Sequence, residues 1–140
     1  MVERPARDWL EWHRPYDDPA SSLSGRLRVV QRHIARALDD RPGPIHLVSM
    51  CAGQGRDLLG VLPAHPRRDD VTALLLETDP RNIAIAEAAI RDAGLERVRV
   101  VRADASITDN YEGAVPADIV LACGVFGKIS GEDVKSMIRC

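Results

Sequence analysis

Cysteines are few in this chain, and long apolar runs are missing. The 140 residues include three cysteines, an odd number without the spacing of a disulfide scaffold or a zinc site. We therefore expect a protein of a reducing compartment, the cytoplasm. No apolar segment approaches the ~20 residues of a membrane span, and the first residues lack the apolar core of a signal peptide. We expect neither a membrane partner nor a bound metal.

A strong excess of one charge is also missing. The formal net charge is -2, which gives no general electrostatic attraction for nucleic acid or for an acidic membrane surface. Hydrophobic residues make up 45% of the chain and charged residues 29%, a balance typical of globular and not of disordered proteins. The length is sufficient for one hydrophobic core. Composition alone thus predicts a globular protein with a single core.

Apolar periodicity predicts alternating helices and strands. Apolar residues three and four apart, from Leu27 to Leu38, indicate an amphipathic helix. Nearly continuous apolar runs, such as the one ending at Glu77, indicate strands buried on both faces. After an arm at 1–21, we expect helices over 22–40, over 56–62, from Asp79-Pro80 to Gly94 and after Ser130, and strands over 45–50, 71–77, 98–102 and 118–123.

This alternation is typical of an α/β fold with a parallel sheet. Right-handed crossovers in a half-wound sheet predict the spatial strand order 3-2-1-4. Ligands of such sheets bind at the carboxyl ends of the strands, where the strand order reverses. That point lies between the first and fourth strands, so the residues that follow the strands are the candidates for a binding site.

The most informative of these segments is Cys51–Gly55, with the sequence Cys-Ala-Gly-Gln-Gly. It joins the first strand to the following helix. A turn at this place needs glycine because it is tight and because a ligand must approach its backbone closely. The turn predicts a nucleotide-like ligand, although a purely structural role as a tight connection stays open.

Acidic and small residues follow the other strands. Glu77 ends the second strand, where a carboxylate can accept hydrogen bonds from both hydroxyls of a ribose. Asp104 follows the third strand and is a natural acceptor for an amino group such as that of adenine. Cys123 and Gly124 stand at the end of the fourth strand and are small enough to let a ligand pass. Structural roles also stay open, with Glu77 as a solvated acid and Asp104 as the cap of a turn before Ser106.

In order and spacing these motifs resemble those of the class I S-adenosylmethionine-dependent methyltransferases. Gly53 and Gly55 match the second and third glycines of the family's first motif, and Glu77 matches the acid of its second. Asp104-Ala105 matches the third motif, and the segment 117–127 matches the fourth. The resemblance covers roughly residues 25–139 and implies a three-layer Rossmann-like sandwich.

The resemblance implies that residues 22–140 form a domain that binds S-adenosylmethionine. It also implies transfer of the sulfonium methyl group to an O, N, S or C atom, a reaction that depends mainly on proximity and orientation. No catalytic residue is assigned, and the acceptor cannot be identified from the sequence. The cofactor-binding residues that the resemblance implies are Cys51, Ala52, Gly53, Gly55, Glu77, Thr78, Asp104, Ala105, Cys123 and Gly124.

Two substitutions and the length depart from the family pattern. Ser49 stands where the family has an acid, and Cys51 stands where it has its first glycine. The family core continues through three more strands, so we expect an incomplete core with the strand 118–123 at an open apolar edge. Natural proteins avoid such edges. We therefore expect a fragment, a truncated gene product or a chain completed by a second copy.

Two roles are open for the N-terminal arm, and two alternative functions are open for the whole chain. The cluster Trp9, Trp12, His13 and Tyr16 predicts either a lid over the ligand or a hydrophobic tether. A nicotinamide-dependent oxidoreductase would share the glycine turn and the following acid, but Leu58 stands where the dinucleotide fingerprint needs Gly or Ala. A non-catalytic module, either a cofactor-binding remnant or an interaction domain, is the other alternative.

Overall fold

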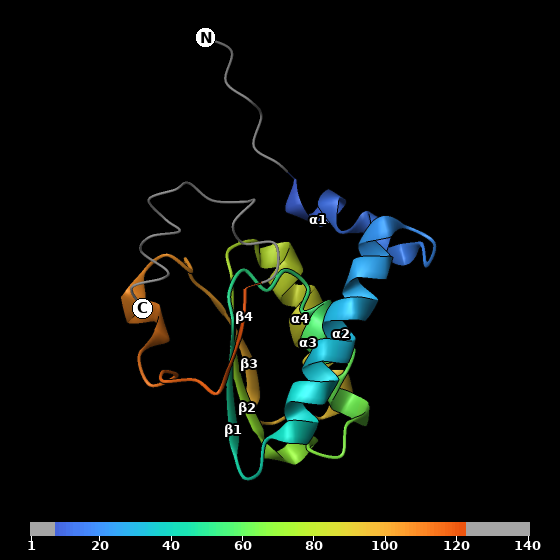
Figure 1. The fold of residues 1–140 in the computed structure, drawn as a ribbon. Helices are drawn as coiled ribbons and strands as arrows, with labels where there is room; N and C mark the ends of the chain where they lie inside the picture. The colour runs from blue at the N-terminus through green and yellow to red at the C-terminus, as the bar shows by residue number, and fades with distance from the viewer. Residues whose placement is uncertain (1–7, 123–140) are drawn as a thin grey trace.

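The structure, a computed structural model, describes residues 8–122 without the side chains of Trp9 and Trp12 (Figure 1). The predicted helix after Ser130 lies outside the described residues, as do Cys123 and Gly124. In chain order the elements are α1 Trp9–Trp12, η1 Arg14–Asp17, α2 Ser22–Asp40, β1 Ile45–Ser49, α3 Arg56–Leu59, η2 Leu62–Ala64, η3 Arg68–Asp70, β2 Val71–Glu77, α4 Pro80–Ala93, β3 Val98–Arg102, η4 Thr108–Tyr111 and β4 Ile119–Leu121.

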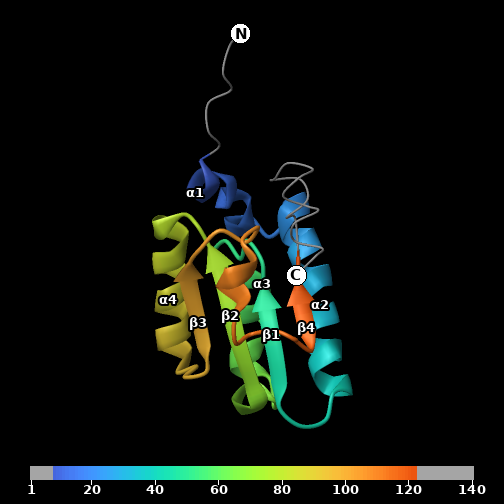
Figure 2. The same cartoon turned by 90° about the vertical axis from the view of Figure 1, so that its left-hand side faces the viewer.

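The described strands form one parallel sheet in the order β3-β2-β1-β4 (Figure 2). This confirms the predicted α/β fold and the predicted order 3-2-1-4. In the register, Val48 of β1 lies beside Leu74 of β2 and Val120 of β4. Because all strands run in the same direction, their carboxyl ends meet at one edge. Residues from four separate segments of the chain are therefore brought to a common site.

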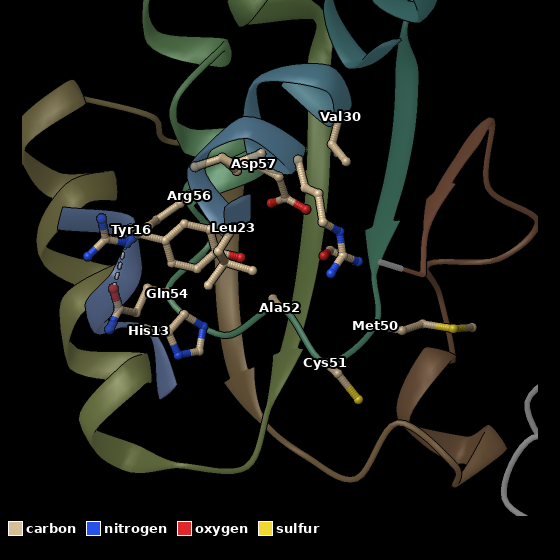
Figure 3. Close-up of a pocket in the computed structure, with 13 residues that line it drawn as sticks. His13, Tyr16, Leu23, Val30, Met50, Cys51, Ala52, Gln54, Arg56 and Asp57 are labelled. Atoms are coloured by element: carbon tan, nitrogen blue, oxygen red, sulfur yellow. Dashed lines mark hydrogen bonds between the residues drawn. The ribbon is translucent and has the colours of Figure 1, made fainter. Parts of the chain in front are cut away.

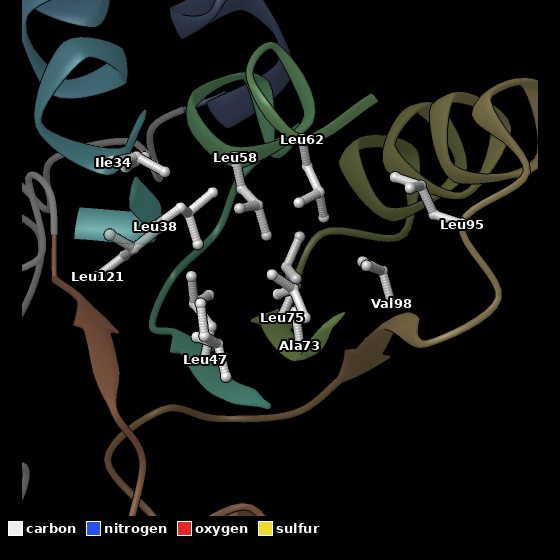
Figure 4. Packing of buried hydrophobic residues seen from close by; sticks show 12 residues of the cluster. Ile34, Leu38, Leu47, Leu58, Leu62, Ala73, Leu75, Leu95, Val98 and Leu121 are labelled. Atoms are coloured by element: carbon white, nitrogen blue, oxygen red, sulfur yellow. The ribbon is translucent and has the colours of Figure 1, made fainter. Parts of the chain in front are cut away.

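The sheet is the middle layer of three. Helices α2, α3 and α4 cover one face, and the connection from β3 to β4, which contains η4, crosses the other (Figure 1). Alternation along the strands fills both interfaces. Leu47 and Leu75 point toward the helices and pack with Leu58 and Leu62 (Figure 4). The alternate strand residues Val48, Leu74 and Leu76 belong to the cluster on the other face, with Tyr111. Burial of each central strand on both faces explains its nearly continuous apolar sequence.

The predicted starts of the two long helices, and the predicted end of the second, are confirmed by their caps. The Ser21 hydroxyl accepts a hydrogen bond from the Ser24 amide at 3.1 Å, and α2 begins at the next residue. The Asp79 carboxylate accepts one from the Arg81 amide at 2.9 Å, with Pro80 as the first residue of α4. Gly94 ends α4 with a φ of 66°, the left-handed conformation that glycine adopts without strain.

Three elements were predicted too long. The helix predicted over 56–62 ends at Leu59, because Gly60 terminates it and Pro63 lies in a separate 3-10 turn. That turn still buries Leu62 completely. The strand predicted over 45–50 ends at Ser49, and the strand predicted over 118–123 is β4, Ile119–Leu121. Within 8–122, no helix has the length and apolar composition needed to cross a bilayer.

The close packing of Gly55 gives a prediction on stability. Gly55 has a φ of 71°, and a Cβ added there would lie 2.8 Å from Cδ1 of Leu59. Gly113 has a φ of 79°, but a Cβ there would meet nothing within 4 Å. Both alanine variants carry the left-handed strain, and only Gly55→Ala adds a collision. Gly55→Ala should lower the free energy of unfolding by at least about 1 kcal/mol more than Gly113→Ala, measured by urea denaturation. Equal losses would contradict the packing argument.

Candidate functional site

The turn 50–55 lies at the carboxyl ends of β1 and β2. The Ala52 amide donates to the carbonyl oxygen of Leu76 at 2.8 Å, which fixes the turn beside the end of β2. The Gly55 amide donates back to the Ala52 carbonyl at 2.9 Å and closes the turn. Cys51, Gly53 and Gly55 all have positive φ angles. The chain thus reverses tightly from strand to helix, as the glycine spacing predicted.

Cys51 adopts the backbone conformation of a glycine. Its φ is 50°, and it is the only residue other than glycine with a positive φ in the described part of the chain. A side chain in this region costs roughly 1–2 kcal/mol. The substitution seen in the sequence therefore changes the residue type and keeps the turn geometry. Such retained strain is characteristic of sites where the backbone must hold a specific shape.

The N-terminal arm lies directly on this turn. His13 is buried, and a Cβ on Gly53 would collide with Nε2 of its imidazole. Gly53 is therefore needed both for its φ of 58° and for the close approach of the arm. The imidazole also packs against the ring of Tyr16, with 5.6 Å between the ring centroids. Contact between arm and turn is compatible with both the lid and the tether hypotheses.

A cavity of about 80 Å³ opens between the arm, α2 and the turn (Figure 3). Apolar α2 residues such as Val30 form one wall, and Met50, Cys51 and Ala52 form the opposite one. Ser49 also lines the cavity, so the position where the family has an acid does face the candidate site. Pockets for whole cofactors usually measure about 300–1,000 Å³. This cavity can therefore enclose only part of such a ligand.

Glu77 ends β2 on the far side of the turn. It is 8% exposed, and its Oε2 accepts a hydrogen bond from Nδ2 of Asn82 in α4 at 3.3 Å. Its own carbonyl accepts the Ala103 amide at 3.0 Å, which sets the chain just before Asp104 beside the end of β2. The following residue, Thr78, is exposed. The structure thus brings Glu77 close to the glycine turn as a buried, positioned acid, not a solvated one.

Asp104 has a structural role that the sequence also allowed. Its Oδ1 accepts two hydrogen bonds from Ser106, one from the hydroxyl at 2.7 Å and one from the amide at 2.9 Å. These bonds lower the pKa of Asp104 below its usual value. Ala105 is buried in the core beneath η4. The carboxylate itself is exposed at the carboxyl edge of the sheet, where it remains available to a ligand.

Sequence reasoning missed three residues that are linked to Glu77 in series. Asn82, Gln54 and Arg56 are joined by side-chain hydrogen bonds, and Asn82 and Gln54 are buried. Gln54 lies within the turn 51–55 at a position to which the motif assigns no role, and Asn82 and Arg56 lie outside the motifs. The one available signal was Asn82, a polar residue beside the apolar Ile83, with which it is buried in the first turn of α4. A buried asparagine needs partners for both ends of its amide.

The lowered pKa of Asp104 gives a prediction on pH. A carboxylate with a folded-state pKa below its unfolded value of about 3.9 stabilises the fold above that pH, and the contribution is lost as pH falls through the folded-state pKa. Asp104→Asn removes the charge and keeps an acceptor oxygen. We expect the wild type to exceed Asp104→Asn in free energy of unfolding at pH 7, with the difference shrinking below pH 4. A difference equal at pH 7 and pH 3 would show that the charge contributes nothing.

Comparison by sequence identifies no relative. The chain matches no protein-family model and no curated protein. Comparison by structure does find similar proteins. A protein of Methanococcus maripaludis assigned to the S-adenosyl-L-methionine-dependent methyltransferases aligns with a TM-score of 0.63 and 17% identity over 99% of this chain and 62% of its own.

Two further solved structures agree. A methyltransferase from Geobacter sulfurreducens, crystallised with S-adenosyl-L-homocysteine, aligns with a TM-score of 0.58 and 15% identity over 99% of this chain and 52% of its own. A precorrin-6y C5,15-methyltransferase from Geobacter metallireducens aligns with a TM-score of 0.53 and 13% identity over 78% of this chain and 54% of its own. The chain thus spans between 52% and 62% of the length of these three structures. At these identities the likeness concerns the fold, and it confirms the predicted resemblance to class I methyltransferases at that level.

Proposed function

We propose that this chain binds S-adenosylmethionine and supplies the cofactor-binding half of a methyltransferase. The observation that carries the proposal is the pairing of a buried acid, Glu77, with a left-handed turn at 51–55 on adjacent strands of a 3-2-1-4 sheet. The shared fold of three methyltransferases supports it. The acceptor would be a nucleophilic O, N, S or C atom.

In this proposal each strand end binds one portion of the cofactor. The backbone of Cys51, Ala52, Gly53 and Gly55 would face the methionine portion, where a tight turn permits close approach. Glu77 would accept hydrogen bonds from the ribose hydroxyls, and Thr78 would line that portion. Asp104 would accept from the adenine amino group, with Ala105 beneath it. Cys123 and Gly124, outside the described residues, would border the methyl group.

The size of the cavity adds a requirement. Because a cavity of about 80 Å³ cannot enclose a whole nucleoside with its amino-acid portion, the adenosine would lie outside it, along the ends of β2 and β3. Alternatively the arm would move away from Gly53. In the first route His13 and Tyr16, which line the cavity, become direct neighbours of the portion of the molecule that the cavity holds.

Methyl transfer of this kind does not require a dedicated catalytic side chain. The cofactor supplies an activated methyl group, and the protein contributes by holding donor and acceptor close and in line. Removal of water by the arm would assist this. We also propose a cytoplasmic location, and a second copy of the chain as the neighbour of β4, one of the two edge strands of the described sheet.

Calorimetric titration of the 140-residue chain tests the cofactor assignment. We expect S-adenosylhomocysteine to bind and NAD not to bind. Glu77→Ala should weaken the binding of S-adenosylhomocysteine by more than ten-fold, or about 1.4 kcal/mol, because the ribose hydroxyls lose their acceptor. Glu87→Ala removes an exposed acid from α4 and serves as the matched control with unchanged affinity.

The other outcomes separate the alternatives. Binding of NAD alone would contradict the methyltransferase proposal and favour an oxidoreductase. Binding of neither molecule would favour a remnant or interaction module. Binding that Glu77→Ala leaves unchanged would show that the ribose contacts some other residue.

A further inference from the structure

A continuous line of polar side chains runs from Glu77 to the N-terminal arm. Oε2 of Glu77 accepts from Nδ2 of Asn82 at 3.3 Å, and Oδ1 of Asn82 accepts from Nε2 of Gln54 at 3.2 Å. Oε1 of Gln54 accepts from Nε of Arg56 at 2.8 Å, drawn as a dashed line in Figure 3. Asn82 is 0% exposed and Gln54 5%. Buried hydrogen bonds of this kind are costly to break.

The direction of every bond in this line is fixed by its two ends. A guanidinium can only donate, so Arg56 requires the oxygen of the Gln54 amide. The nitrogen of Gln54 then faces the oxygen of Asn82, and the nitrogen of Asn82 faces Glu77. A carboxylate can only accept, so this last bond also has the required direction. The cation at one end therefore orients the amides toward the anion at the other.

The outer end of the line is held by the arm. Nη2 of Arg56 lies 3.3 Å from Oδ1 of Asp17, and its guanidinium carbon lies 5.2 Å from the centre of the Tyr16 ring. These contacts set the plane of the guanidinium. A second anchor, the Arg81–Asp8 ion pair at 2.9 Å, holds the arm to α4. Arm docking and Glu77 orientation are thus connected through a single series of side chains.

We propose that Arg56, Gln54 and Asn82 are positioning residues that hold the Glu77 carboxylate in one orientation for the ribose hydroxyls. The inference rests on the proposed function of Glu77. Seating of the arm on Arg56 fixes Gln54, Gln54 fixes Asn82, and Asn82 fixes one carboxylate oxygen. Affinity for the ribose then depends on the arm, although Arg56 itself need not touch the ribose.

A double-mutant cycle without any ligand tests the fixed direction. Gln54→Glu keeps the shape of the side chain and its bond to Arg56, but it places carboxylates on both sides of Asn82. One of them must then face the oxygen of the Asn82 amide. Glu77→Gln keeps the original direction and should change the unfolding midpoint little. In the double variant Gln54→Glu/Glu77→Gln, Asn82 can turn over and satisfy both neighbours, and the net charge equals that of the wild type.

We expect Gln54→Glu to lower the urea midpoint and Glu77→Gln to restore at least half of that loss. If Gln54→Glu does not fold, recovery of a cooperative transition in the double variant is the equivalent result. A double variant no more stable than Gln54→Glu would overturn the proposal, because the two side chains would then act independently.

A ligand comparison tests the effect on the ribose. The measurement is the ratio of affinities for S-adenosylhomocysteine and its 2′,3′-dideoxy analogue. We expect a ratio of at least about ten in the wild type, reduced three-fold or more by Arg56→Met. Arg14→Met makes the same chemical change in an exposed pair with Glu11 and should leave the ratio unchanged.

An equal loss of affinity for both ligands in Arg56→Met would overturn the positioning role. A general loss of structure weakens the binding of a ligand whether or not it carries the ribose hydroxyls. The failure of the proposed function has a different signature. In that case the wild type binds neither compound, or binds both equally, whatever the result of the unfolding cycle.

Discussion

The reversal of the chain between β1 and α3 is the constraint on which the rest of the structure depends. Within residues 50–55 the backbone must leave the sheet, reverse its direction at the strand ends and return α3 to the sheet face. Left-handed conformations at 51, 53 and 55 make this possible. The same compactness lets Ala52 bond to β2, lets Leu58 reach the core and leaves room for His13 above Gly53. Site, core and arm all meet at this turn.

The polar network extends this constraint to the second strand end. The turn carries Gln54, whose side chain donates to Asn82 of α4. Arg56, the first residue of α3, donates to Gln54 and forms the outer end of the line, at the arm. Asn82 stands on the first turn of α4, whose start is set by the Asp79 cap and Pro80. Local backbone geometry at two helix starts therefore determines how Glu77 is presented. Glu77, a residue that is 8% exposed, is thereby held by a hydrogen bond from its neighbour Asn82.

Much of this architecture was predictable, and the reasons for success and failure are physical. The bounds of β2 and β3 and the ends of α4 followed from apolar runs and capping residues, which act locally. The strand order followed from the handedness of crossovers. The line from Glu77 to Arg56 was not predictable, because it joins residues 28 apart in sequence that meet only after packing. Arg67, which binds the carbonyl oxygens of Arg41 and Gly43, was missed for the same reason.

A structure of the chain with S-adenosylhomocysteine tests the central claim most directly. The account predicts ribose hydroxyl oxygens within about 2.6–3.0 Å of the Glu77 carboxylate, with Asn82 still bound to that carboxylate and the methionine portion against the turn 51–55. A ribose placed away from Glu77, or a ligand bound on another face of the sheet, would contradict it.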